Sequence, residues 1–224
     1  MTTTTDDFLT VLDLSGEFEA ALQGCFPEGA LLLADSSPKH ELAAAAAQLT
    51  LEHAVAVRAA FAVNAPNSAA ALLRLQYEAL LRSAWLLYAA SADQVAKLTR
   101  TLDAAAELAS KNVPPSSDML GAIGRTAPAG LSKPLAEFNQ YSRHALNSFV
   151  HAGIHPLART RTGFPTELAL KLLTFSNAMM HFAYRLLAGL TGSQRRMDKV
   201  THLYRSFEPC LPVTGEPPET TAST

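Results

Sequence analysis

The chain has 224 residues, of which 48% are hydrophobic and 17% are charged, and its formal net charge is −2. This length allows one substantial core, so we expect a single domain. No apolar run reaches the roughly 18–20 residues of a membrane span, and the start MTTTTDDF does not resemble a signal peptide, which predicts a cytoplasmic protein that does not enter a membrane. Cys25 and Cys210 lie far apart, so a disulfide framework is not expected.

Charge is distributed unevenly along the chain. Residues 1–120 hold 7 Lys and Arg against 14 Asp and Glu, whereas residues 121–205 hold 11 against 3. Such asymmetry is typical of a protein that meets an anionic partner such as nucleic acid. It also fits two halves that attract each other within one bundle or across a dimer. The sequence leaves both interpretations open.

Helical periodicity dominates the first half, and Pro and Gly mark the expected helix ends. We predict a short acidic amphipathic segment over residues 7–24 and helices over residues 39–62, 67–91 and 92–111. Residues 112–132 contain three prolines and three glycines. We expect them to form a long connection with one short helical turn at DMLGAIG.

The second half continues the pattern, with helices predicted over residues 134–152, 165–190 and 193–207. Residues 208–224 have the composition of a disordered tail, and no segment alternates with the period of two that indicates a strand. The expected fold is therefore all-α: a single-domain helical bundle of about five to six helices over residues 1–207, followed by a disordered tail over 208–224.

The helix over 67–91 is apolar on nearly every side, which predicts a central position. It nevertheless carries Arg74, Glu78 and Arg82 at positions i, i+4 and i+8. Charges on a buried helix must be paired, and this spacing lets Glu78 bridge both arginines. The strip is either an internal ion network that fixes the register of the helix or a source of free guanidinium groups for an anionic ligand.

Polar side chains gather on one face of the helix over 134–152, opposite an apolar face that includes Leu135, Phe138 and Leu146. An ordinary solvent face is rich in Lys, Glu and Arg, whereas this one carries groups that make short, directional hydrogen bonds. We therefore expect the face to lie in a cleft or at a subunit contact. Its members are Glu137, Gln140, Tyr141, His144, Asn147, Ser148, His151 and, where the helix continues, His155.

The helix over 165–190 repeats this theme with Asn177, His181, Tyr184 and Arg185 along one strip. A single histidine on such a helix is more often a hydrogen-bonded structural residue than a ligand-binding one. Several polar strips in one bundle favour binding, so His181 is a candidate for contact with an anion or a partner.

The stretch HALNSFVHAG, preceded by a central helix that reads RLQYEALLRSAWL, resembles the HEPN superfamily (higher eukaryotes and prokaryotes nucleotide-binding) over residues 67–190. The resemblance implies an HEPN-like helical bundle that forms a homodimer. Many members are metal-independent ribonucleases of toxin–antitoxin and phage-defence systems. Their motif is an arginine, usually a polar residue such as Asn, three variable residues and a histidine. Asn147 and His151 match its last two elements, but Leu146 stands at the arginine position.

The resemblance implies that His151 and Asn147 are catalytic, together with the neighbouring His144. Histidine suits such chemistry because it can accept and return a proton near neutral pH while an RNA 2′-hydroxyl attacks its own phosphate. An arginine is needed to stabilise the charge that develops on the phosphorus. Without the motif arginine, this role falls to Arg143, or to Arg159 and Arg161 in the expected loop LARTRTG.

Three functions remain open. The first is a metal-independent ribonuclease or toxin that uses His151, and the second is a catalytically silent module that binds a nucleotide, RNA or a protein. The third is a helical protein that binds a small anion. No cofactor is expected, because the chain contains no phosphate-binding glycine loop and no Glu-x-x-His pair for a metal. The candidates for anion or partner binding are Arg159, Arg161, His155, Arg74, Glu78, Arg82 and His181.

Overall fold

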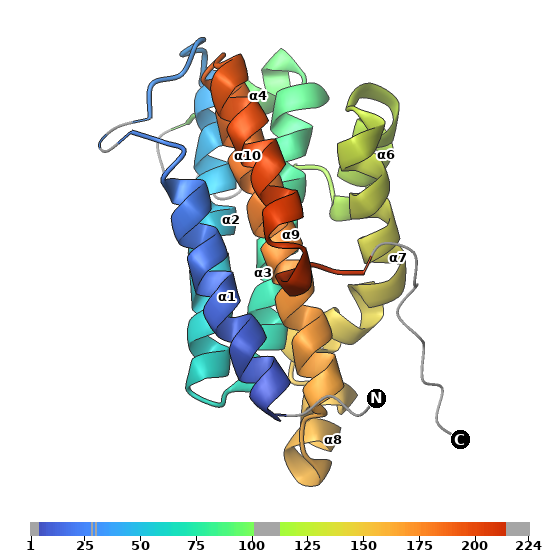
Figure 1. Ribbon diagram of the computed structural model, residues 1–224. Helices are drawn as coiled ribbons and strands as arrows, with labels where there is room; N and C mark the ends of the chain where they lie inside the picture. The colour runs from blue at the N-terminus through green and yellow to red at the C-terminus, as the bar shows by residue number, and fades with distance from the viewer. Residues whose placement is uncertain (1–4, 28, 30, 101–112, 214–224) are drawn as a thin grey trace.

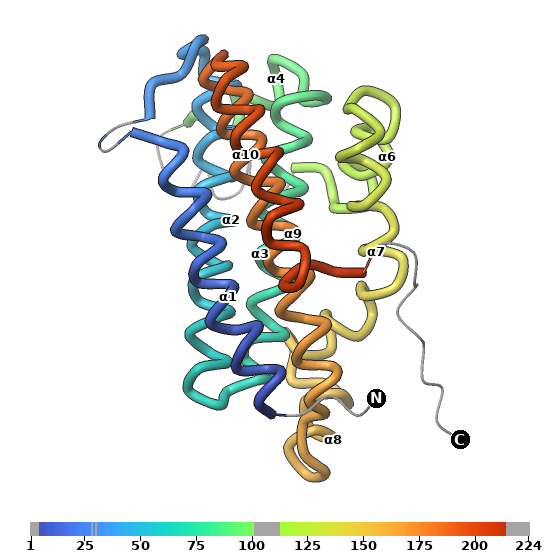
Figure 2. Tube along the Cα trace, viewed as in Figure 1, coloured from blue at the N-terminus to red at the C-terminus, as the bar shows by residue number. Residues whose placement is uncertain are grey.

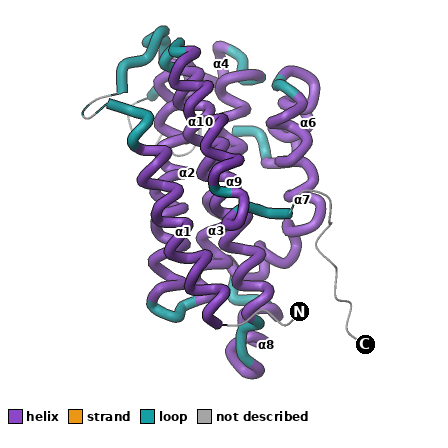
Figure 3. The backbone as a smooth tube through the Cα atoms, viewed as in Figure 1, coloured by secondary structure: helices purple, strands orange, loops and turns teal. Residues whose placement is uncertain are grey.

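The computed structural model describes residues 5–27, 29, 31–100 and 113–213. Within these residues the chain is all-helical and contains no strand, which confirms the predicted fold class (Figure 3). No helix among them is long and apolar enough to cross a membrane. The helices are α1 (Thr5–Gln23), α2 (Pro38–Ala62), α3 (Pro66–Tyr88), α4 (Ala92–Leu98), α6 (Ser116–Thr126), α7 (Ala129–Val150), α8 (Ile154–Thr162), α9 (Thr166–Leu190) and α10 (Gln194–Ser206), followed by the 3₁₀ helix η1 (Glu208–Cys210).

Helices α2, α3 and α9 form the centre of the bundle (Figure 1). Helix α2 packs along α3, and both contact α9. Helices α1 and α10 cover α9 on one side, whereas α6 and α7 pack against α3 on the other (Figure 2). Helix α8 follows α7 at one end of the bundle.

The sequence of α2 explains its close packing against α3. Ala43 and Ala47 are fully buried in α2, and alanine combines high helix propensity with a side chain small enough for two backbones to approach. Ser83 of α3 uses this proximity, because its hydroxyl donates to the carbonyl of Ala43 at 2.8 Å. Asn64, with φ of 56°, lies in the short turn that joins the two helices.

Buried amides fix the register of the central helices. Gln76 of α3 donates from Nε2 to the carbonyl of Ser176 at 2.9 Å and accepts from the Ser176 hydroxyl at 2.7 Å. Both residues lie in the interior, where unpaired polar groups are costly, so this pair favours one alignment of α3 with α9. The pairing of Gln76 with Ser176 was not predicted from the sequence.

Two segments that were predicted as connections are helices. Helix α6 occupies much of the predicted connection over 112–132, because Met119 and Ile123 are buried against the core. Helix α7 therefore begins at Ala129, five residues before the predicted start, and contains Pro134. Helix α8 includes most of the predicted loop LARTRTG. These two helices, together with α1 over the predicted amphipathic segment 7–24, raise the number of described α-helices to nine, above the five to six expected.

The predicted helix over 92–111 is shorter in its described part, where α4 ends at Leu98. Its Ser91 forms a capping box with Gln94, as the sequence SADQ suggests. The predicted continuation over residues 101–112 lies outside the described residues.

The packed chain extends beyond the predicted domain end at residue 207. Helix η1 follows α10 directly, and Cys210 and Leu211 are buried against α1 and α9. Asn177 of α9 holds this segment by donating from Nδ2 to the carbonyl of Cys210 at 2.8 Å and to the hydroxyl of Ser15 at 2.7 Å. Residues 208–211 are thus part of the bundle, and the predicted tail over 214–224 lies outside the described residues.

Candidate functional site

The junction between α7 and α8 is a tight turn that fixes how the two helices meet. His151 ends α7, and its backbone N–H donates to the carbonyl of Asn147 at 3.1 Å. The hydroxyl of Ser148 then accepts from the backbone N–H of His155 at 3.1 Å, and the Ser148 carbonyl accepts from Gly153 at 2.8 Å. A Cβ atom on Gly153 would lie 2.6 Å from the Ser148 hydroxyl oxygen, so a larger residue at this position would displace the hydroxyl from its place in the turn.

The predicted catalytic residues lie near this junction and face solvent. Arg143, His144 and His151 are exposed, and Asn147 is half-buried. His155 is also exposed, and its ring stacks on Phe149 with a centroid distance of 6.0 Å. The side chains lie on an open surface of the single chain, whereas a cleft or a subunit contact was expected. A contact with a second copy remains a prediction.

Helix α8 adds two further cations to this surface. Arg159 is half-buried and Arg161 is exposed, both in the last turn of the helix. The hydroxyl of Thr160 accepts from the Asn67 amide at 3.2 Å, which ties α8 to the start of α3. We call the surface formed by α7 and α8, residues 129–162, the α7–α8 face.

The α7–α8 face is electropositive. Its residues include four Lys and Arg but only one acidic residue, Glu137. The three described ion pairs join Glu19 with Arg58, Asp35 with His40, and Arg74 with Glu78, and so all lie within residues 1–120. None of the eleven cations of residues 121–205 takes part in them, so these ion pairs give no support to attraction between the two halves within one chain.

Apolar side chains are also exposed on this face. Ile154 and Leu157 of α8 have 77% and 61% of their surface exposed, and Tyr141 and Val150 of α7 have 42% and 38%. No residue of α8 is buried. A patch of this kind on a surface rich in cations is typical of a site that contacts a partner.

The strip Arg74–Glu78–Arg82 is only partly the network that the sequence suggested. Arg74 is buried, and its Nη2 lies 2.6 Å from Oε1 of Glu78, as the spacing predicts. Glu78 forms no ion pair with Arg82 among the described residues, and its own side chain is 39% exposed. The strip therefore reaches the surface at Glu78, and the helix is not buried on every side.

The buried guanidinium of Arg74 packs over the Tyr77 ring, with its Cζ atom 5.4 Å from the ring centroid. Its Nε and Nη1 atoms have no hydrogen-bond partner within the described part of the chain. The Tyr77 hydroxyl donates to the carbonyl of Leu135 at 3.2 Å, and burial raises the pKa of this tyrosine. Arg74 thus lies in the packed interior beside Tyr77 and is not exposed to a ligand.

His181 is a structural residue, contrary to its predicted role in binding. Only 3% of its surface is exposed, and Nε2 lies 3.0 Å from the carbonyl of Val200 in α10. Its ring packs among Phe18, Phe182 and Tyr204. Burial lowers the pKa of His181 to about 4, so the ring is neutral at neutral pH. It joins α9 to α1 and α10.

An open cavity of about 630 Å³ lies between the end of α1 and α10, lined by Cys25, Lys199 and His202. Burial raises the pKa of the Cys25 thiol, although Lys199 and Arg196 act against this shift. The thiol donates to the carbonyl of Ala21 at 3.5 Å. A thiol that is mostly protonated and bonded to a carbonyl is not an activated nucleophile.

A second cavity, of about 310 Å³, lies where the loop before α2 meets the ends of α3 and α9. Its polar lining consists of Asp35, His40, Tyr88 and Arg185, and we call it the Arg185 cavity. The sequence did not reveal it, because its residues come from distant segments. The only signal was that Arg185 has no acidic residue within one turn of its helix.

Metal binding finds no support within the described residues, where no three His, Cys, Asp or Glu side chains are grouped as metal ligands. Searches of curated proteins and of solved structures give no significant match. One protein family, described as a family of unknown function (DUF6988), matches residues 47–213. This range covers most of the chain and includes α3, α7, α8 and α9. The chain therefore belongs to the DUF6988 family.

Proposed function

We propose that the protein is an HEPN-like module that binds RNA through the α7–α8 face. The observation that carries this proposal is the set of four cations on that face, three exposed and one, Arg159, half-buried, against one acidic residue. None of these cations takes part in a described ion pair. Cations of this kind bind phosphates and release counterions from the nucleic acid.

Single-stranded RNA suits this surface better than a duplex. Tyr141 is 42% exposed, and the His155 ring already stacks on Phe149. Flat side chains beside cations allow unpaired bases to stack while the phosphates meet the guanidinium groups. Arg143 and Arg161 are the exposed arginines that would make the phosphate contacts.

A second candidate function is cleavage of the bound RNA without a metal. His151 is exposed at the end of α7, one turn after Asn147, and so can reach a phosphate from solvent. In this role His151 accepts the proton of the attacking 2′-hydroxyl, and Arg143 stabilises the charge on phosphorus. His144 lies beside Arg143 and would return a proton to the leaving oxygen.

Labelled single-stranded RNA, incubated with the protein in EDTA, tests both functions at once. We expect binding that weakens steeply with salt, and a double variant Arg143→Gln, Arg161→Gln should lose roughly tenfold or more in affinity. Arg205→Gln, an exposed arginine of α10, is the matched control and should bind as the wild type does. Equal affinities of wild type and the double variant would overturn the proposal.

Cleavage is read from the same samples. If RNA is cleaved in EDTA, His151→Ala should remove cleavage and retain most of the binding, because one histidine contributes little to phosphate contacts. Binding without cleavage assigns the silent form of the module. Cleavage that survives in His151→Ala would show that another residue acts as the base.

A homodimer is the proposed assembly, as the resemblance to HEPN proteins implies. The exposed side chains of Ile154 and Leu157 support a contact between two copies at α8. Such a contact would place two copies of His151 on one continuous surface. The RNA would then lie along both α7–α8 faces.

A further inference from the structure

The Arg185 cavity is a preformed space and does not depend on the α7–α8 face. The backbone N–H of Ala34 donates to the carbonyl of Leu190 at 2.9 Å, which holds the loop before α2 against the end of α9. Gly192 allows this contact, because it has a φ of 68° and because a Cβ at this position would lie 2.9 Å from the Cβ of Ala34. The loop is therefore a fixed wall of the cavity.

The cavity contains a guanidinium group with unused hydrogen-bonding capacity. Arg185 is half-buried, its Nε atom is fully buried, and this atom has no hydrogen-bond partner among the described residues. Tyr88 lines the same cavity as Arg185. Burial raises the pKa of its hydroxyl, and the charge of Arg185 opposes that shift. The guanidinium as a whole is only half-buried and lines the cavity, so a ligand that accepts hydrogen bonds from its accessible N–H groups would gain affinity.

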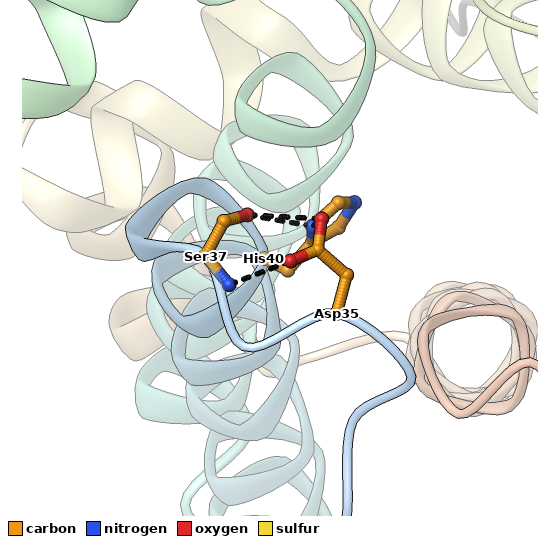
Figure 4. A network of polar contacts seen from close by, with 3 residues as sticks. All are labelled: Asp35, Ser37 and His40. Carbon is orange, nitrogen blue, oxygen red and sulfur yellow. Dashed lines mark hydrogen bonds and ion pairs between the residues drawn. The ribbon is translucent and has the colours of Figure 1, made fainter.

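The acidic residue of the cavity does not neutralise Arg185. Figure 4 shows the Asp35 carboxylate turned toward Ser37 and His40. It accepts from the backbone N–H of Ser37 at 2.8 Å and from the Ser37 hydroxyl at 3.2 Å, and it lies 2.7 Å from Nδ1 of His40. The backbone hydrogen bond and the nearby His40 hold the pKa of Asp35 below its usual range. Asp35 is thus a charged part of the loop.

These three residues are not a catalytic triad. The Ser37 hydroxyl lies 2.8 Å from Nδ1 of His40, the same nitrogen that contacts Asp35. A triad needs the serine and the carboxylate on opposite nitrogens of the imidazole. The network instead shapes the entrance to the cavity. Nε2 of His40 takes no part in the network.

We propose that the Arg185 cavity binds the carboxylate of a small apolar acid, with Arg185 as the anchoring group. A guanidinium presents a planar pair of donors that matches a carboxylate, and Tyr88 provides a further hydroxyl. The rest of the lining is mainly apolar and includes Leu87, Leu190 and Met197. The volume of about 310 Å³ lies at the lower end of the roughly 300–1,000 Å³ of small-molecule sites.

The same features favour a monocarboxylate over inorganic phosphate. One arginine offers a single positive charge, and the negative charge of Asp35 at the entrance would repel a dianion. The apolar wall would remain uncovered by phosphate, whereas a short alkyl chain would bury it. The expected ligand therefore has one carboxylate and an apolar body of a few carbon atoms.

Titration of the full chain with hexanoate, hexan-1-ol and inorganic phosphate tests this proposal. The protein would be labelled with ¹³C at its methionine methyl groups, because Met197 lines the cavity whereas Met119, buried in α6, does not. We expect hexanoate to shift the Met197 signal saturably and to leave Met119 unchanged. Hexan-1-ol and phosphate should bind roughly tenfold more weakly or not at all, because hexan-1-ol lacks the carboxylate and phosphate lacks the apolar chain.

Variants locate the anchor. Arg185→Gln should weaken hexanoate binding about tenfold, the usual effect of losing a charged hydrogen bond, and Arg205→Gln should bind as the wild type does. Equal binding of hexanoate and hexan-1-ol, preference for phosphate, or no shift of Met197 would overturn the proposal. Full affinity in a folded Arg185→Gln would also overturn it. If that variant fails to fold, the comparison of hexanoate with hexan-1-ol on the wild type decides the question alone.

Discussion

At the residue scale, the burial of His181 makes stability depend on pH. The pKa of its ring falls from an ordinary value of 6.5 to about 4 in the folded state, chiefly because of burial. As the pH falls, His181 therefore takes up its proton at a higher pH in the unfolded chain than in the folded one. The contribution of neutral His181 to the stability of the fold is complete above about pH 6.5. It is lost progressively between pH 6.5 and pH 4.

Glutamine has no titratable group, so the variant His181→Gln lacks this pH dependence. Between pH 7 and pH 5 we expect the free energy of unfolding of the wild type to fall by about 2 kcal/mol more than that of the variant. Urea unfolding at the two pH values measures the difference. An equal loss in both proteins would show that His181 does not cause the pH dependence.

The ion pair of Arg74 with Glu78 gives a second prediction at this scale. Glu78→Ala removes the ionic partner that the described residues give to the buried guanidinium of Arg74, yet the exposed position of Glu78 lets water replace part of the contact. We expect a loss of about 1–2 kcal/mol, below the cost of breaking a fully buried pair. In chemical unfolding, Arg74→Met combined with Glu78→Ala should recover most of this loss. A double variant that is less stable than Glu78→Ala would contradict the explanation.

Sequence spacing predicted this pair correctly and its extension to Arg82 incorrectly. A helical wheel shows that Glu78 has an arginine one turn away on each side, but it cannot show which of them the neighbouring helices bury. Tertiary packing buries Arg74 and leaves Arg82 half-buried. Which arginine pairs with Glu78 is therefore decided by tertiary contacts, and the sequence of a single helix does not encode them.

At the element scale, the long helices were predicted well. The predicted ranges 7–24, 39–62, 67–91, 165–190 and 193–207 end within three residues of α1, α2, α3, α9 and α10. Their apolar faces and their flanking Pro and Gly residues carry strong local signals. Helix α6 was predicted only as a short helical turn at DMLGAIG, and α8 was predicted as a loop. Their glycines and prolines are typical of loops, and tertiary packing overrides that preference.

The segment after α10 illustrates the same limit, because Pro209 and its surroundings resemble a disordered tail. Leu211 is nevertheless 4% exposed, and the Cys210 carbonyl accepts a hydrogen bond from Asn177. We expect a chain that ends at Phe207 to be about 2–4 kcal/mol less stable than one that ends at Val213, since it loses a buried leucine and a buried hydrogen bond. Thermal unfolding of the two truncated chains measures this difference, and equal melting temperatures would show that η1 does not stabilise the bundle.

At the scale of the whole molecule, the sequence indicated the fold class and the basic second half. It could not indicate which polar residues meet in space. The Arg185 cavity combines side chains from the loop before α2, from α2, from α3 and from α9, and no periodicity links them. The α7–α8 face was easier to anticipate, because its histidines and arginines lie close together along the chain.

The exposed α8 also bears on assembly. This helix has nine residues and buries none of them, although isolated helices of that length are marginal in water. Its contacts with α7 and α3 hold it in place but leave Ile154 and Leu157 uncovered. Burial of these side chains against a second copy would stabilise the helix and remove the apolar patch from water.

We therefore expect the wild-type protein to be a dimer in light scattering, and the double variant Ile154→Glu, Leu157→Glu to be a monomer. Two carboxylates at the contact would have to lose their hydration on association, which is strongly unfavourable. The monomer should keep the circular dichroism of the wild type, because neither side chain packs in the core. Leu32→Glu is the matched control, since Leu32 is 82% exposed outside the α7–α8 face and its replacement should leave the dimer intact. A wild-type protein that stays monomeric at micromolar concentrations would contradict a dimer through α8.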